Sequence, residues 1–158
     1  ELIESTPIVN VHFWYDRQLT DLRFSAFVNS PLQWVFNKSA MLEQGESGQY
    51  IDISLSAAEE YMEMTKDEII EMFKREMQAL FPNARTANIE RALVIKYDNA
   101  TFDPSPGISG LRPPHKTPVD GLFLAGDWTD TGWPSTMEGA VRSGFKAARG
   151  VVKVMNGS

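Results

Sequence analysis

Several common features are missing from this sequence, and each absence excludes a class of function. The chain has no cysteine, which excludes disulfides, thiolate catalysis and cysteine zinc sites. It has no apolar run near the ~18 residues of a membrane span. No basic run appears, and the net charge is -6 with a pI near 4.9, so nucleic-acid binding is disfavoured. The two histidines, His12 and His115, lie too far apart for metal-ligand spacing.

Sequence motifs for nucleophilic and dinucleotide chemistry are also absent. There is no G-x-S-x-G elbow for a hydrolase serine. There is no G-x-G-x-x-G turn of the kind that holds the ADP part of a dinucleotide. The chain starts at Glu1 rather than at a methionine. We therefore expect a piece of a longer protein whose dinucleotide-binding half lies before Glu1.

The remaining pattern predicts a sheet followed by helices. Alternating or continuous apolar residues predict strands over residues 7–17, 24–28, 32–36, 50–55 and 90–97. Ser56 with Glu59 predicts a capping box for a short helix to about Met62. Thr65 with Glu68 predicts a second capping box, before a helix whose stripe is Ile69, Phe73, Met77 and Leu80 and whose end is Pro82.

The last third of the chain has a different organisation. Residues 99–118 form a long Pro/Gly-rich segment, which exceeds ordinary connections and favours a functional or cofactor-covering loop. A short apolar strand over 122–125 and a helix from Ser135 or Thr136 follow. We expect an α+β chain with three parts. Residues 1–98 are expected to be part of a substrate-binding domain with a mixed or antiparallel sheet and a helical cover. Residues 99–118 are the connecting loop, and residues 119–158 are the strand–helix segment.

The strand–helix segment has the composition of one wall of a large cofactor site. Asp127 follows the strand end at Gly126, where a carboxylate can accept hydrogen bonds from sugar-like hydroxyls. Ser135 and Glu138 predict a capping box, and free N–H groups at a helix start favour an electron-rich group. The helix carries a predicted packing stripe of small and apolar residues: Ala140, Val141, Gly144, Ala147, Ala148, Val151, Val152 and Met155. Taken alone, Asp127 is more often a turn residue and such a stripe more often plain packing.

Three stretches carry a resemblance to a known family: LFLAGDWTDTGWPSTMEGAVRSG (122–144), PIVNVHFWYDR (7–17) and PLQWVFNK (31–38). They resemble the C-terminal portion of the flavin-dependent amine oxidase and phytoene desaturase superfamily. The greatest similarity is to squalene-associated FAD-dependent desaturases, now called hydroxysqualene dehydroxylases. The chain is thus expected to be a fragment of an α/β FAD-binding enzyme, containing the last strand and helix of its FAD-binding domain.

The resemblance implies roles for individual residues. Asp127 would bind a hydroxyl on the ribityl or pyrophosphate side of FAD, and the backbone N–H of Met137 would meet the flavin pyrimidine edge. Thr136 would lie near the substrate side of the ring. The residues expected to hold FAD are Gly126, Asp127, Pro134, Ser135, Thr136, Met137 and Ala140. Neither the residues nor the resemblance names a catalytic side chain.

The resemblance implies an oxidoreductase of isoprenoid biosynthesis. The main expectation is hydride transfer to hydroxysqualene, giving squalene. The alternatives are a carotenoid (phytoene-type) desaturase and a non-catalytic lipid or protein interaction module. An amine oxidase is disfavoured because Thr136 supplies no aromatic ring. We expect a long apolar isoprenoid partner, a cytoplasmic location with peripheral membrane contact, and an isolated chain that self-associates, is inactive and binds FAD weakly.

Overall fold

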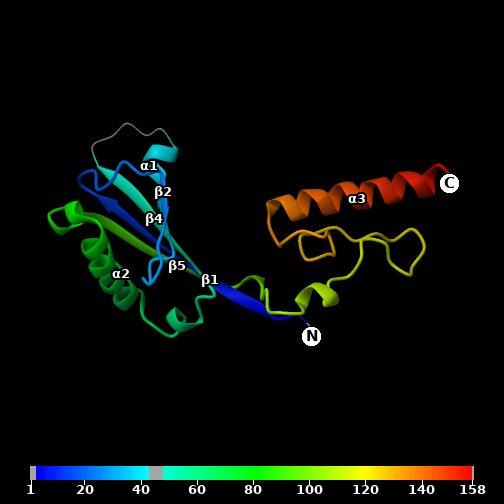
Figure 1. Cartoon of the computed structure of the whole chain (residues 1–158), viewed down its shortest axis with the longest axis horizontal. Helices are drawn as coiled ribbons and strands as arrows, with labels where there is room; N and C mark the ends of the chain where they lie inside the picture. Colours follow the sequence, from blue (N-terminus) through cyan, green and yellow to red (C-terminus); the bar gives the residue numbers. More distant parts are fainter. Residues whose placement is uncertain (1–2, 43–47, 158) are drawn as a thin grey trace. The chain divides into compact units, whose positions relative to one another are not determined.

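The computed structural model describes residues 3–42 and 48–157, and these form two compact units (Figure 1). One unit is Thr6–Ala100, and the other comprises Glu1–Ser5 with Thr101–Ser158. The division falls inside the strands β1 and β5. Each unit has its own packing and is described separately below.

The first unit is built on a sheet whose strand order is β2-β3-β4-β1-β5. The strands are β1 (Ser5–Tyr15), β2 (Phe24–Ala26), β3 (Trp34–Asn37), β4 (Gln49–Ser56) and β5 (Ile89–Phe102). The pairs β1–β4, β3–β4 and β2–β3 are antiparallel, and His12 lies opposite Asp52 in the first of these pairs. A short helix, α1 (Lys38–Met41), leads out of β3. The α+β class with an antiparallel sheet is confirmed, and the five strands fall close to their predicted positions.

The core of this unit lies between the sheet and α2 (Lys66–Leu80), which covers one face of the sheet (Figure 1). Alternate residues of β1 are fully buried there, among them Val9, Val11 and Phe13. Ile69, Phe73 and Met77 of α2 are buried on the other side of this core. Each such side chain contributes roughly 1.5–3 kcal/mol by leaving water. Leu80, which was predicted in the same stripe, is instead 39% exposed because it lies at the end of the helix.

Only one of the two capping boxes predicted in this unit forms. Thr65 accepts from the Glu68 N–H while the Glu68 carboxylate accepts from the Thr65 N–H, so that box is confirmed. The box predicted for Ser56 with Glu59 is wrong. A single 3-10 turn, η1 (Glu59–Tyr61), stands there without a side-chain cap. Glu59 is engaged elsewhere, because it accepts a hydrogen bond of 2.6 Å from the Thr6 hydroxyl.

In the second unit, irregular segments lead to one long helix, α3 (Met137–Met155). Strand β5 continues to Phe102, four residues into the segment predicted as a connecting loop, and a 3-10 turn, η3 (Ile108–Leu111), follows within that segment. Residues 122–125 do not form the predicted strand. They make one antiparallel bridge, between Lys116 and Phe123. A strand needs neighbours to pair its backbone, and the described part of this unit supplies only that bridge partner.

The face that α3 buries also differs from the prediction. Gly139 and Ser143 are buried, and a Cβ on Gly150 would come within 2.4 Å of the Phe123 ring. The predicted stripe is largely exposed, with Val141 at 54% and Met155 at 80%. Small residues let the helix approach the loop closely on one side, and the larger apolar side chains point away from that contact. Of the helices in the described residues, none has the length and apolar character needed to cross a membrane.

Candidate cofactor site

The turn that contains Gly126 is fixed by local packing. Gly126 has φ +148°, and a Cβ there would lie 2.2 Å from Nε1 of Trp128. The Thr129 hydroxyl donates to the Gly126 carbonyl at 2.7 Å, and Thr129 is almost fully buried. Only glycine fits this backbone conformation beside the indole ring. The turn therefore places Asp127 in a defined position.

Asp127 and the start of α3 lie together, as the predicted site requires. The Ser135 hydroxyl donates to Oδ2 of Asp127, although the two residues are eight positions apart. Both are half-buried. Ser135 therefore holds the carboxylate and does not cap the helix. The second carboxylate oxygen can still accept a hydrogen bond from a ligand hydroxyl.

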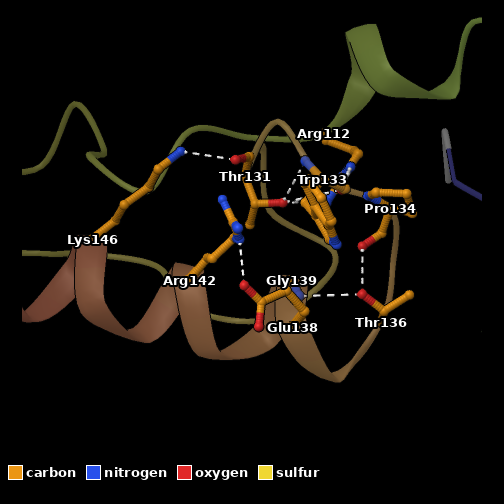
Figure 2. Close-up of polar contacts among 9 residues, drawn as sticks. All are labelled: Arg112, Thr131, Trp133, Pro134, Thr136, Glu138, Gly139, Arg142 and Lys146. Atoms are coloured by element: carbon orange, nitrogen blue, oxygen red, sulfur yellow. Dashed lines mark hydrogen bonds and ion pairs between the residues drawn. The ribbon is translucent and has the colours of Figure 1, made fainter.

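The cap of α3 is Thr136, the second of the two predicted start positions. Its side chain accepts from the Gly139 N–H at 3.3 Å and donates to the Pro134 carbonyl at 3.2 Å (Figure 2). Glu138 bonds Arg142 at 2.7 Å instead of the cap, so the Ser135–Glu138 box is wrong. The first N–H groups of a helix have no partner within it, and the helix dipole makes that end positive. This end of α3 can therefore stabilise negative charge.

The outer rim of the predicted site is exposed. Met137 has 89% of its surface accessible, and Pro134, Thr136 and Ala140 are also exposed. A Cβ on Gly139 would lie 2.7 Å from the Pro134 carbonyl oxygen, so this glycine lets the helix start pack against the preceding loop. The structure thus brings the seven predicted residues to one end of α3. A carboxylate and a positive helix end suit the hydroxyls and the electron-rich ring edge of FAD.

Sequence reasoning missed the side chains that hold this loop in place. Arg112 donates to the carbonyl of Asp127. It also donates to the carbonyl of Trp133, and Lys146 donates to the Thr131 carbonyl at 3.1 Å (Figure 2). Arg142 lies over the Trp133 ring, with Cζ 4.4 Å from its centroid. These contacts join residues 9 to 21 positions apart through irregular backbone. No periodic pattern connects them, and the only sequence signal is the length of the loop 99–118.

Comparison with known proteins defines the family. Residues 1–152 match the model of the family described as flavin containing amine oxidoreductase. The chain belongs to this family. Its members are flavin-dependent oxidoreductases, and FAD is their cofactor.

Named relatives of this chain are carotenoid desaturases. The 15-cis-phytoene desaturase of Narcissus pseudonarcissus is 31% identical over 93% of this chain and 27% of its own length. That of Synechococcus elongatus is 26% identical over 95% of this chain and 33% of its own length. The zeta-carotene desaturase of Solanum lycopersicum is 33% identical over 68% of this chain and 18% of its own length. The chain thus spans a third or less of these relatives.

Solved structures share the fold of the chain. An oxidoreductase from Methanosarcina mazei aligns over 93% of the chain with a TM-score of 0.63 and 18% identity. A second structure, from Exiguobacterium sp. 255-15, aligns over 99% with a TM-score of 0.67 and 9% identity. Each match covers little more than a third of the other protein, 35% and 36%. At these identities, the likeness is evidence of fold alone.

Proposed function

We propose that this chain is part of an FAD-dependent desaturase that acts on a long isoprenoid hydrocarbon of the phytoene type. The observation that carries the proposal is the similarity to 15-cis-phytoene desaturases over 93% or more of the chain. Hydroxysqualene dehydroxylation, the main expectation from the sequence motifs, is the second candidate. It is supported by the resemblance of residues 122–144 but by none of the relatives named above. A non-catalytic interaction module is less favoured, because the candidate cofactor residues lie together.

In this proposal, the second unit contributes one wall of the FAD site. Asp127, oriented by Ser135, accepts a hydrogen bond from a hydroxyl of the cofactor. The N–H groups at the start of α3, at Met137, would hold the electron-rich edge of the ring system, because a helix dipole stabilises negative charge there. When bound, FAD supplies the hydride chemistry of the reaction.

The first unit has aromatic side chains on one face of its sheet that suit an apolar substrate. On the sheet face opposite α2, Trp14 stacks on Tyr50 with ring centroids 4.5 Å apart, and Arg91 lies over Trp14 at 4.7 Å. Phe24 and Trp34 are 58% and 43% exposed. Flat aromatic side chains of this kind offer a large contact area to an extended apolar chain. We propose that this face contributes to isoprenoid binding.

Four polar side chains on the same sheet face bond one another. Tyr50 and His12 form a hydrogen bond of 3.0 Å, and Nδ1 of His12 lies 3.4 Å from Asp52. Asn10 donates to Asp52 at 3.2 Å. A neutral polar group that already has a partner loses little when hydrocarbon covers it. The pairing of these groups is compatible with a substrate that lacks polar groups.

The two candidate substrates can be separated directly. The full-length protein is purified with its flavin and incubated in parallel with phytoene and with hydroxysqualene, and the products are resolved by chromatography. The proposal expects a product with additional double bonds from phytoene and none from hydroxysqualene. Formation of squalene alone would support the second candidate, and no turnover of either substrate would refute both.

The 158-residue chain by itself is expected to bind FAD weakly and to be inactive. It has Asp127 and the helix start, but no G-x-G-x-x-G turn to hold the ADP part. Titration of the chain with FAD, followed by flavin fluorescence, is expected to show no saturation in the micromolar range. Micromolar or tighter binding would contradict this expectation.

We also propose a protein partner and a cellular location for this chain. The main partner would be the dinucleotide-binding half of the same enzyme. A cytoplasmic site of action with peripheral membrane contact would suit a substrate that dissolves in lipid. Flotation of the full-length protein with phospholipid vesicles would test that contact.

A further inference from the structure

Arg112 makes the largest set of polar contacts to the loop that contains Asp127. Its Nη2 donates to the Asp127 carbonyl at 2.6 Å and to the Thr131 hydroxyl at 3.2 Å. Nη1 donates to the Trp133 carbonyl at 2.7 Å. Figure 2 shows the guanidinium reaching Thr131 and Trp133 from the segment that precedes the loop. One side chain thus holds both ends of the loop 127–133.

The surroundings of Arg112 indicate that its position depends on this loop. All three acceptors are uncharged, and no carboxylate pairs with the guanidinium in the described part of the chain. Its Nε is buried and has no hydrogen-bond partner among the described residues. The guanidinium also lies over the Phe102 ring, with Cζ 5.6 Å from the centroid. A buried donor without a partner is costly, and it persists where other contacts fix the side chain.

The two carbonyls that Arg112 binds lie in the backbone beside the predicted cofactor residues. One is the carbonyl of Asp127 itself, so the bond restricts the peptide that orients the carboxylate. The other belongs to Trp133, immediately before the turn of Pro134 that leads into the cap at Thr136. The guanidinium therefore helps to set the separation between the carboxylate and the start of α3, together with the direct bond from Ser135 to Asp127. A guanidinium presents its donors in a fixed fork, and lysine cannot reproduce that geometry.

We propose that Arg112 is the positioning residue of the cofactor segment. It holds Asp127 and the start of α3 at the separation that FAD requires. The proposal rests on the proposed function, since it assumes that this segment binds FAD. Lys146 bonds the same loop at one point only, the Thr131 carbonyl. Neither the sequence motifs nor the family resemblance assigned any role to Arg112.

The test compares Arg112→Met and Arg112→Lys with a matched arginine replacement, Arg149→Met, on the exposed surface of α3. In the full-length protein, FAD affinity and the visible absorption spectrum of the bound flavin are measured. In the 158-residue chain, amide hydrogen exchange is followed for residues 126–134 and for α2.

We expect R112M to weaken FAD affinity at least tenfold, to alter the flavin spectrum, and to speed exchange in residues 126–134 but not in α2. R112K should resemble R112M, because it keeps the charge but loses the fork. R149M should match the wild type in every measurement. The proposal would be overturned if R112M bound FAD within twofold of the affinity of R149M and left the flavin spectrum unchanged. It would also be overturned if R112K restored wild-type FAD affinity in full. A full-length wild type that holds no FAD would instead refute the proposed function.

Discussion

At the scale of single residues, Tyr15 is the most unusual group of the first unit. Its side chain is 3% exposed, and its hydroxyl is buried without a hydrogen-bond partner in the described chain. Burial raises the pKa of the Tyr15 phenol, so the group stays neutral in the folded protein at pH values where it ionises when unfolded. A buried unpaired hydroxyl carries a desolvation cost that no contact offsets.

Tyr15→Phe is therefore expected to stabilise the protein by about 1 kcal/mol at neutral pH. The wild type should lose stability as the pH rises through about 10, where the unfolded phenol ionises. A raised folded pKa gives stability that is present below the unfolded pKa and lost above it. Urea denaturation at pH 7 and at pH 10.5 measures the free energy of unfolding. Between these two pH values, Y15F should lose less of it than the wild type.

Tyr61→Phe is the control for this prediction. Burial, together with a hydrogen bond to Glu60, raises the pKa of Tyr61 to about 12. Because its hydroxyl has a partner, Y61F should give no gain at neutral pH. Destabilisation of Y15F by more than about 1 kcal/mol would show that the hydroxyl has a partner after all.

Sequence reasoning at this scale succeeded where neighbours in the chain interact. The start of α3 at Thr136, one of the two predicted positions, follows from local spacing, because a capping side chain bonds a residue three positions on. Arg112 could not be predicted, because its three acceptors lie 15 to 21 residues away in irregular backbone. Ser135 had the residue type of a cap but bonds Asp127, a contact that depends on how the intervening loop folds.

At the scale of elements, the two predicted capping boxes of the first unit provide a matched pair. Thr65→Ala should destabilise α2 by ~1 kcal/mol, because it removes the acceptor for the Glu68 N–H. Ser56→Ala should change stability by less than ~0.5 kcal/mol, since its exposed side chain caps no helix. Urea denaturation followed by circular dichroism measures both. Equal losses would mean that Ser56 does cap a helix in solution.

Two glycines of α3 provide a second pair. Gly139→Ala should weaken the packing of the helix start by ~1–3 kcal/mol, because its Cβ would come within 2.7 Å of the Pro134 carbonyl oxygen. Gly144→Ala has open space and should stabilise the helix by ~0.5–1 kcal/mol. Amide exchange across α3 reports each change. Faster exchange in G144A than in G139A would contradict this assignment of the packed face.

The elements that were mispredicted share a physical cause. The apolar run 122–125 and the stripe with Val141 and Met155 indicate surfaces suited to burial, and hydrophobic pattern carries no information about the partner. Within the described residues, the run 122–125 forms a single β-bridge, and most side chains of the stripe are exposed. The strands of the first unit were predictable because their ladder partners and their covering helix lie in the same 95 residues.

At the scale of the whole molecule, α3 carries an exposed apolar face from which we predict behaviour in solution. Met137, Phe145 and Met155 are 89%, 62% and 80% exposed on one side of the helix. Contiguous apolar surface of this kind tends to associate. We expect the 158-residue chain to self-associate with increasing concentration in light scattering.

The double variant Phe145→Glu, Met155→Glu should return the chain to a monomer, because it places charge on that face. Val28→Glu is the control, since Val28 is 88% exposed but lies in the other unit. It should leave association unchanged. A wild type that remains a monomer across the concentration range would contradict the prediction.

The tightly packed glycines of the second unit also have a genetic consequence. A Cβ would come within 2.2 Å of the Trp128 ring at Gly126, 2.7 Å of the Pro134 carbonyl at Gly139 and 2.4 Å of the Phe123 ring at Gly150. Every single-base change in the first two positions of a glycine codon adds a side chain or stops translation. These codons therefore have no mild replacement one mutation away. Backbone packing alone would make these positions intolerant in a random library, whether or not a ligand contacts them.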